Sequence, residues 1–242
     1  MKRIFFFLIF SLSYSSFLFS ADRYFIFTNG NWYDTLNWSN TSGVAGNALV
    51  PTFADNVFFD DSSFIAGQFV DVSGGVAECN DMDWTGLLVS PKLLGDASSE
   101  IHIYGSAIFN SAINITTVFQ ELRSTFYFNS ILPLKTISSN GFAFSTLTPV
   151  HFDGIGGSWT LLDPFVSSTD VFLDRGELIT NNYNFSAYSF LSTNINIRSL
   201  QLGSSTMSIS NTWNLSNTTN LTFDGGTSTI LFQACSGNFR GG

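Results

Sequence analysis

The chain has 242 residues, of which 44% are hydrophobic, 11% are charged and 27 are phenylalanine. So low a charge content argues against a disordered tail and against a helix-rich cytosolic protein. The length suffices for one or two domains with a sizeable core, and Ser, Thr, Asn and Gly supply most of the polar surface, as suits strands and turns.

The first segment, residues 1–20, has the pattern of a secretory signal peptide. Lys2 and Arg3 form a positive start, residues 4–10 form an apolar run, and Ser20 or Ala21 could stand just before the cleavage site. A retained membrane anchor is the alternative, but the serines at 11, 13, 15 and 16 weaken the segment as a spanning helix. We therefore expect a secreted or cell-surface protein with no membrane span after cleavage.

Cleavage changes the charge balance. Loss of Lys2 and Arg3 leaves seven basic and 18 acidic residues, a net charge of −11. This charge disfavours nucleic acid and anionic membranes as partners. It permits divalent cations, although diffuse acidity usually serves solubility alone.

Residues 24–64 have an aromatic-rich character of their own. Trp32 and Trp38 follow each other closely, and a β-prone run from Asn56 to Asp60 comes after a Gly-containing loop. The pattern predicts a small cap over the first coil of a repeat protein, because an uncapped end exposes strand edges and core. The alternative is a sugar-binding platform, if the two Trp side chains are exposed.

Two acidic pairs are candidate calcium ligands. Asp81 and Asp83 alternate on one side of an expected strand, and Asp60 and Asp61 are adjacent. Neither pair has the further ligands or the glycine spacing of a known calcium loop. We interpret both as solvated strand or turn carboxylates, and we expect no metal site and no cofactor.

Short pairs of strands recur from residue 98 onward. Period-two alternation is broken by Gly, Ser and Asp-Gly turns, and Val150 to Leu161 matches Leu221 to Phe232 position for position. The first strands of the pairs begin at residues 101, 126, 150, 171, 200 and 221. This loose period predicts an all-β fold, a right-handed parallel β-helix or solenoid, and a β-sandwich is the alternative.

The expected domain organisation is a signal peptide over 1–20, a cap with the first strands over 21–97, and solenoid coils over 98–242. Alternate apolar residues of the first strands should stack coil on coil in one interior row. That row comprises Ile103, Phe128, Phe152, Leu173, Leu202 and Phe223.

The two cysteines are Cys79 and Cys235. Their separation is too wide for a zinc or redox pair, and an exported protein could join them in a disulfide. Because they fall near opposite ends of the predicted solenoid, we expect them not to pair with each other. Each is then buried or bound to a partner outside the chain.

Candidate catalytic residues are few. His102 and His151 occupy equivalent first-strand positions, face outward and could stack two coils apart. Asp153 and Asp224 are interpreted as turn formers, and the charged residues Arg175, Glu177 and Arg198 stand apart from one another. No nucleophile triad, phosphate loop or metal motif is present in the sequence, so we expect no catalytic residues and no enzyme.

The order of the motifs resembles the N-terminal region of very large surface and adhesin-like proteins exported by Bacteroidetes-type bacteria. The motifs that carry the resemblance are Gly30-Asn-Trp32, Asn37-Trp-Ser39, Asp55 to Asp60, Cys79 to Gly86, Ile103 to Ser106, Gly156 to Leu161, Arg198 to Ser205 and Thr227 to Ile230. The resemblance implies a β-helical region followed by further modules and a type IX sorting domain. It offers no catalytic residues, and this chain stops at Gly242 without such modules.

The expected function is a non-catalytic extracellular structural or adhesive module, with surface glycans or other cell-surface proteins as partners. A polysaccharide-active β-helix enzyme or a carbohydrate-binding module is the alternative. No polar cap follows the last strand, so we expect the solenoid to continue beyond Gly242 into further domains of the same polypeptide.

Overall fold

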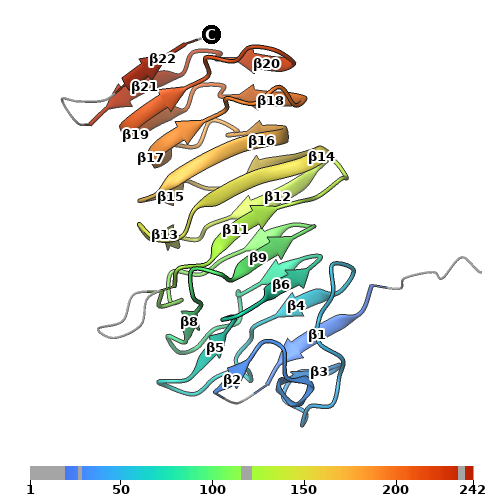
Figure 1. Cartoon of the computed structure of the whole chain (residues 1–242). Coiled ribbons are helices and arrows are strands. Elements are labelled where there is room, and N and C mark those ends of the chain that lie inside the picture. Colours follow the sequence, from blue (N-terminus) through green and yellow to red (C-terminus); the bar gives the residue numbers. More distant parts are fainter. Residues whose placement is uncertain (1–19, 27–28, 116–121, 234–237, 242) are drawn as a thin grey trace, which may run out of the picture.

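The computed structural model describes residues 20–26, 29–115, 122–233 and 238–241, which wind into a stack of parallel β coils (Figure 1). The strands fall on three faces, here called faces 1, 2 and 3, and each coil from β6 onward passes through them in that order. The all-β parallel solenoid is confirmed, and the β-sandwich alternative is wrong. The predicted signal peptide, apart from Ser20, and Cys235 lie outside the described residues.

Face 1 carries the site described below. Its rungs pair in parallel, each with the equivalent strand of the next coil. They are β6 (Val76–Cys79), β9 (Glu100–Ile103), β11 (Thr125–Phe128), the first halves of β14 (Val150–Leu161) and β16 (Asp170–Ile179), the second halves of β17 (Phe185–Leu191) and β19 (Thr206–Asn214), and β22 (Asn238–Arg240).

Faces 2 and 3 complete each coil, and long strands turn the corners between faces. Face 2 comprises β1 (Asp22–Phe25), β4 (Asn56–Phe58), β7 (Met82–Asp83), β10 (Ala107–Ile108), β12 (Lys135–Ser138), the second halves of β14 and β16, β18 (Arg198–Gln201) and β20 (Leu221–Asp224). Face 3 comprises β2 (Gly30–Asn31), β5 (Phe69–Asp71), β8 (Lys92–Leu94), β13 (Ala143–Phe144), β15 (Phe165–Ser167), the first halves of β17 and β19, and β21 (Thr229–Phe232).

The core is the interior of this tube. Alternate side chains of every rung point inward, and in-register pairing stacks like on like along the axis, so that Phe128 lies 5.1 Å from Phe152 and Phe165 lies 4.9 Å from Phe185 between ring centroids. These rings are fully buried. Burial of each large side chain contributes about 1.5–3 kcal/mol, so only the sum over many stacked interior side chains can oppose the backbone entropy that the coils lose.

The predicted interior row is right for its first four members and wrong for its last two. Ile103, Phe128, Phe152 and Leu173 pair in register on face 1. Leu202 and Phe223 belong instead to the side of face 2, where Leu200 pairs with Leu178 and with Phe223. The neighbouring interior row of face 1, which includes Ala77 and Ile101, continues from Val171 through Phe190 and Trp213. All three faces share the same inward and outward alternation, so periodicity alone cannot assign a strand to a face.

The N-terminal end is covered by an aromatic cluster. β3 (Trp38–Ser39) follows a 3-10 turn, η1 (Thr35–Asn37), and pairs antiparallel with β1, so that both edges of β1 have partners. Trp32 and Trp38 are both buried, with ring centroids 4.9 Å apart, and Trp38 Nε1 donates to the Trp32 carbonyl at 2.6 Å. Two buried rings cannot serve as a sugar-stacking platform, so that alternative is wrong.

The last described coil differs from those before it. Phe223 is 47% exposed and Phe239 is 59% exposed, whereas the equivalent Leu200 and Trp213 of the preceding coil are at most 1% exposed. Interior-type side chains therefore reach solvent at this end of the described coils.

Candidate functional site

A column of side chains runs along the outside of face 1. His102 pairs in register with Tyr127, Tyr127 with His151, and His151 with Phe172. Because these residues stand at outward positions of in-register parallel strands, their rings must stack at about the 4.8 Å spacing of the strands. The ring centroids are 4.6, 4.8 and 4.3 Å apart in that order. We call these four residues the ring column.

The sequence predicts that His102 and His151 face outward two coils apart and could stack, and the pairing registers place both in one outward file with Tyr127 between them. Tyr127, which lies between them, and Phe172, which extends the column, were not predicted. The sequence carries the signal for both, since each follows the first residue of the Phe126 and Val171 strands as His102 and His151 follow Ile101 and Val150.

His102 is held from two sides. Its Nε2 lies 2.8 Å from Glu100 Oε2 on the same strand, and its Nδ1 lies 2.8 Å from Asn129 Nδ2 of the next coil. An amide nitrogen can only donate, so Nδ1 accepts and Nε2 carries the proton toward Glu100. One coil earlier, Glu78 accepts a hydrogen bond from the Tyr104 hydroxyl at 3.1 Å.

His151 is held by a carboxylate of the next coil. Its Nδ1 lies 2.6 Å from Asp174 Oδ2, and Asp174 Oδ1 accepts from Asn194 Nδ2 at 3.2 Å. Arg175 Nε lies 3.2 Å from Asp153 Oδ1, so an ion pair stands directly beside the column. Asp153 was interpreted as a turn former, and this is wrong. It lies within β14, where the register shifts and pairs it with Arg175.

The surroundings of the column are acidic. Burial raises the pKa of the Tyr127 hydroxyl above its ordinary value, and the carboxylates Glu100, Asp174 and Asp153 add to that shift. Burial also raises the pKa of the Asp153 carboxyl, although the guanidinium of Arg175 opposes the change. A ligand on this face therefore meets ring edges, imidazoles and carboxylates together.

An apolar groove lies at the corner between faces 1 and 2. Ile155, Ile195 and Ile197 are each at least 66% exposed and line a hollow of about 440 Å³, together with Arg175, Asn196 and Asn220 among others. Glycines make room at the same corner. A Cβ at Gly176, whose φ is +78°, would lie 2.5 Å from the Gly154 carbonyl oxygen. Arg175 thus borders both the ring column and the groove.

Three charged residues that were predicted to stand apart have partners in the structure. Arg175 pairs with Asp153, and Glu177 Oε1 accepts from Ser199 Oγ at 2.9 Å and from Gln201 Nε2 at 2.6 Å. Arg198 is 1% exposed, and burial lowers the pKa of its guanidinium. It donates to four oxygens: those of the Asn196, Asn217 and Thr219 carbonyls and the Ser192 hydroxyl, at 2.8–3.0 Å.

Carboxylates of both acidic pairs considered for calcium accept hydrogen bonds from backbone amides. Asp83 Oδ1 accepts from the Thr85 amide at 2.7 Å, Asp81 Oδ1 accepts from the Ser106 amide at 2.6 Å, and Asp60 Oδ1 accepts from the Ser62 amide at 2.9 Å. Asp224 accepts from the Gly226 amide at 3.0 Å, as its predicted turn role requires. Within the described ranges, no group of three or more His, Cys, Asp or Glu side chains could hold a metal ion.

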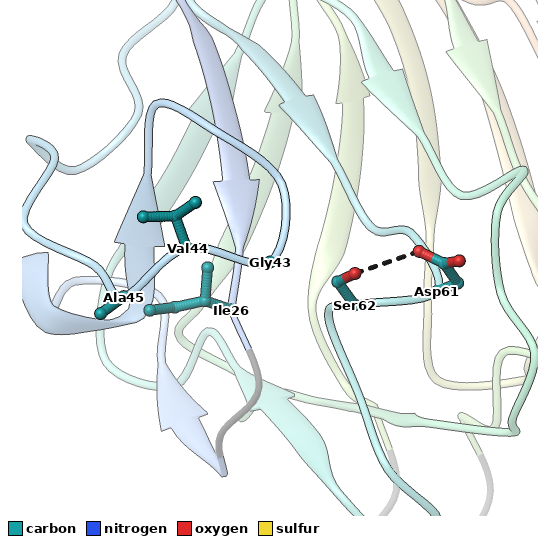
Figure 2. Close-up of a pocket in the computed structure, with 6 residues that line it drawn as sticks. All are labelled: Ile26, Gly43, Val44, Ala45, Asp61 and Ser62. Atoms are coloured by element: carbon teal, nitrogen blue, oxygen red, sulfur yellow. Dashed lines mark hydrogen bonds between the residues drawn. The ribbon is translucent and has the colours of Figure 1, made fainter.

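Asp61 borders a small pocket at the capped end. Figure 2 shows Ile26 and Val44 across the hollow from Asp61 and Ser62, with the Ser62 hydroxyl donating to Asp61 Oδ1 at 3.1 Å. The pocket has a volume of about 300 Å³ and is completed by Gly43 and Ala45. A single carboxylate in a largely apolar lining gives this pocket no cation chemistry.

Cys79 faces the interior of the tube. It is fully buried and has a free thiol, and burial raises the pKa of that thiol well above its ordinary value. The thiol is therefore protonated and inert at neutral pH.

In the part of the chain that the structure describes, no helix has the length and apolar character needed to cross a membrane. A scan against protein-family models found no match, and searches of curated proteins and of solved structures found no significant match.

Proposed function

We propose that this chain is a non-catalytic extracellular module with a structural or adhesive role, which binds its partner along the outer surface of face 1. The ring column is the observation that carries the proposal. Every rung of face 1 is hydrogen-bonded to its neighbours, so the coils hold the column as a straight strip that loses little entropy on binding.

The partner is a glycan or another protein of the cell surface. Export is the expectation from the pattern of residues 1–20, and the motif order resembles surface and adhesin-like proteins.

A polysaccharide-active enzyme is the second candidate, and one observation favours it. His151, Asp153 and Asp174 lie on neighbouring rungs, and burial raises the pKa of Asp153, as in acid–base pairs of glycosidases. We favour binding because these carboxylates are engaged, Asp174 with His151 and Asn194, and Asp153 with Arg175.

Adhesion of beads coated with the secreted protein to cells of the source organism and to its extracted surface material tests the function. Retention should fall at least several-fold in Tyr127→Ala and His151→Ala. Tyr183→Ala is the matched control, because Tyr183 is an exposed tyrosine in the turn between faces 2 and 3. Equal retention of all three variants, each with an unchanged circular dichroism spectrum, would show that the ring column takes no part in adhesion.

A further inference from the structure

The ring column is parallel to the axis of the solenoid. It occupies consecutive rungs, β9, β11, β14 and β16, and Glu78 of β6 extends the same file by one rung. At about 4.8 Å per rung, these five positions span roughly 19 Å. A ligand that matches the column must therefore be linear and must repeat at a similar spacing.

The column offers edges rather than ring faces. Its rings stack on one another at 4.3–4.8 Å, so their faces are covered by their neighbours. Polar tips remain on the outside. Among the described residues, the Tyr127 hydroxyl and His151 Nε2 have no hydrogen-bond partner, since His151 uses only Nδ1. These groups suit a ligand rich in hydroxyls more than one with aromatic or aliphatic side chains.

The carboxylates beside the ring column disfavour the binding of acidic ligands. Glu78, Glu100 and Asp174 flank it with carboxylates that are partly exposed, Glu100 to 39% and Asp174 to 29%. The nearby cation, Arg175, is paired with Asp153. A polyanion would meet like charges along the whole strip, whereas hydroxyl groups can donate to the free lone pairs of these carboxylates.

We propose that face 1 binds a linear polysaccharide without acidic groups, which lies along the solenoid axis with about one sugar unit per rung. This inference rests on the proposed binding function of face 1 and names its ligand class. Pyranose units in an extended chain advance by a length comparable to the rung spacing, so each sugar can lie beside one rung, and in a β-1,4-linked chain alternate sugars present the same edge to the column. Amino groups on the sugars strengthen binding through the carboxylates.

Titration calorimetry with three sets of purified oligosaccharides tests the inference: cello-oligosaccharides, chitosan oligosaccharides and oligogalacturonates. Neutral or amino-sugar chains should bind, and affinity should rise with chain length to a plateau at about five sugars, because the next residue of the file beyond Phe172 is the aliphatic Leu191. Oligogalacturonates should bind at least about tenfold more weakly than the best of the other two sets.

Variants locate the site. Tyr127→Ala and Asp174→Asn should each weaken binding about tenfold or more, whereas Tyr183→Ala should leave it unchanged. Tighter binding of oligogalacturonates, no length dependence, or full affinity in Tyr127→Ala would each overturn the inference. So would the absence of binding to all three sets.

The bead assay distinguishes failure of the proposed adhesive function from failure of the proposed ligand class. If cells are retained through the ring column but no oligosaccharide of these classes binds, the ligand class is wrong and the adhesive function stands. If neither assay depends on the ring column, both are wrong.

Discussion

A hydrogen bond joins His151 to Asp174 of the adjacent coil, with Nδ1 of the imidazole 2.6 Å from Oδ2 of the carboxylate. A carboxylate accepts, so neutral His151 carries its proton on Nδ1 and leaves Nε2 free toward solvent. His102 is arranged in the opposite way, because Asn129 donates to its Nδ1. The same ring column thus holds its two histidines in different tautomers.

Heteronuclear NMR of the imidazole nitrogens should report this difference at a pH where both rings are neutral. We expect the Nδ1–H form for His151 and the Nε2–H form for His102. Asp174→Ala should shift His151 toward the tautomer usual for free histidine and leave His102 unchanged. Identical tautomers in the wild-type protein would contradict the hydrogen bonding of the column.

Arg198 should be among the most costly residues to replace. Its guanidinium donates to four oxygens from the loops around Ser192–Asn196 and Asn217–Thr219, so truncation leaves buried acceptors unpaired. We expect Arg198→Ala to lower the free energy of unfolding by about 3–5 kcal/mol. Arg198→Lys should not restore it, because an ammonium group lacks the planar fork.

Chemical denaturation measures these two variants against Arg175→Ala, whose side chain is 41% exposed and should cost about 1 kcal/mol or less. Equal losses of unfolding free energy for Arg198→Ala and Arg175→Ala would show that the four hydrogen bonds of Arg198 do not stabilise the fold.

Charge placed in the buried interior should be far more costly than charge placed in the last described coil. Phe152→Asp buries an unpaired carboxylate and should cost several kcal/mol, as should Leu202→Asp. Phe223→Asp should cost much less, because that ring is 47% exposed. Denaturant melts of the three variants compare them.

Ser208→Asp is the control for these melts, since Ser208 faces outward between the buried Met207 and Ile209. Gln201→Asp is unsuitable, because Gln201 Nε2 donates to Glu177 and the new carboxylate would face a like charge. A loss for Ser208→Asp as large as that for Phe152→Asp would mean that the facing of the strands is wrong.

Tyr33 gives the capped end a dependence on alkaline pH. Its hydroxyl donates to the Val72 carbonyl at 2.9 Å, and burial raises its pKa to about 12 from the ordinary value of 10.0. The neutral form is favoured by folding, so this contribution is complete below the unfolded pKa and is lost as pH rises from about 10 to about 12.

Phenolate absorbance and denaturant midpoints across that range check the effect. Tyr33→Phe should flatten this part of the stability profile and should lower stability at neutral pH by about 1 kcal/mol through loss of the hydrogen bond. An unchanged alkaline profile in Tyr33→Phe would place the titrating group elsewhere.

The sequence predicted the strands, the parallel stacking and the first four members of the interior row. Alternation and turn residues are local signals, and both survive in each coil. The assignment of Leu202 and Phe223 to the interior row of face 1 was wrong because the number of residues between equivalent positions differs from coil to coil. Val171 and Phe190 are 19 residues apart, whereas Val150 and Val171 are 21 apart, and alternation does not record which corner is shortened.

The site was predicted in part for the same reason. His102 and His151 stood out as rare residue types at equivalent positions, whereas Tyr127 and Phe172 did not stand out among so many aromatic residues. Two partners of Arg198, the Asn196 carbonyl and the Ser192 hydroxyl, are close to it in the sequence. Its other partners, Asn217 and Thr219, and the partner of Arg175, Asp153, lie 19 to 22 residues away in the sequence, on other coils. Such contacts depend on the register between coils, which local pattern does not fix.

The central claim is that face 1 binds without cleaving. It is tested most directly by incubating the purified protein with polysaccharides, including those of its own cell surface, and measuring the bound fraction and newly formed chain ends in the same samples. We predict retention of polymer through the ring column with no new ends above a protein-free blank. Reproducible depolymerisation that is lost in His102→Ala, His151→Ala or Asp153→Asn would contradict the account and assign these residues to catalysis.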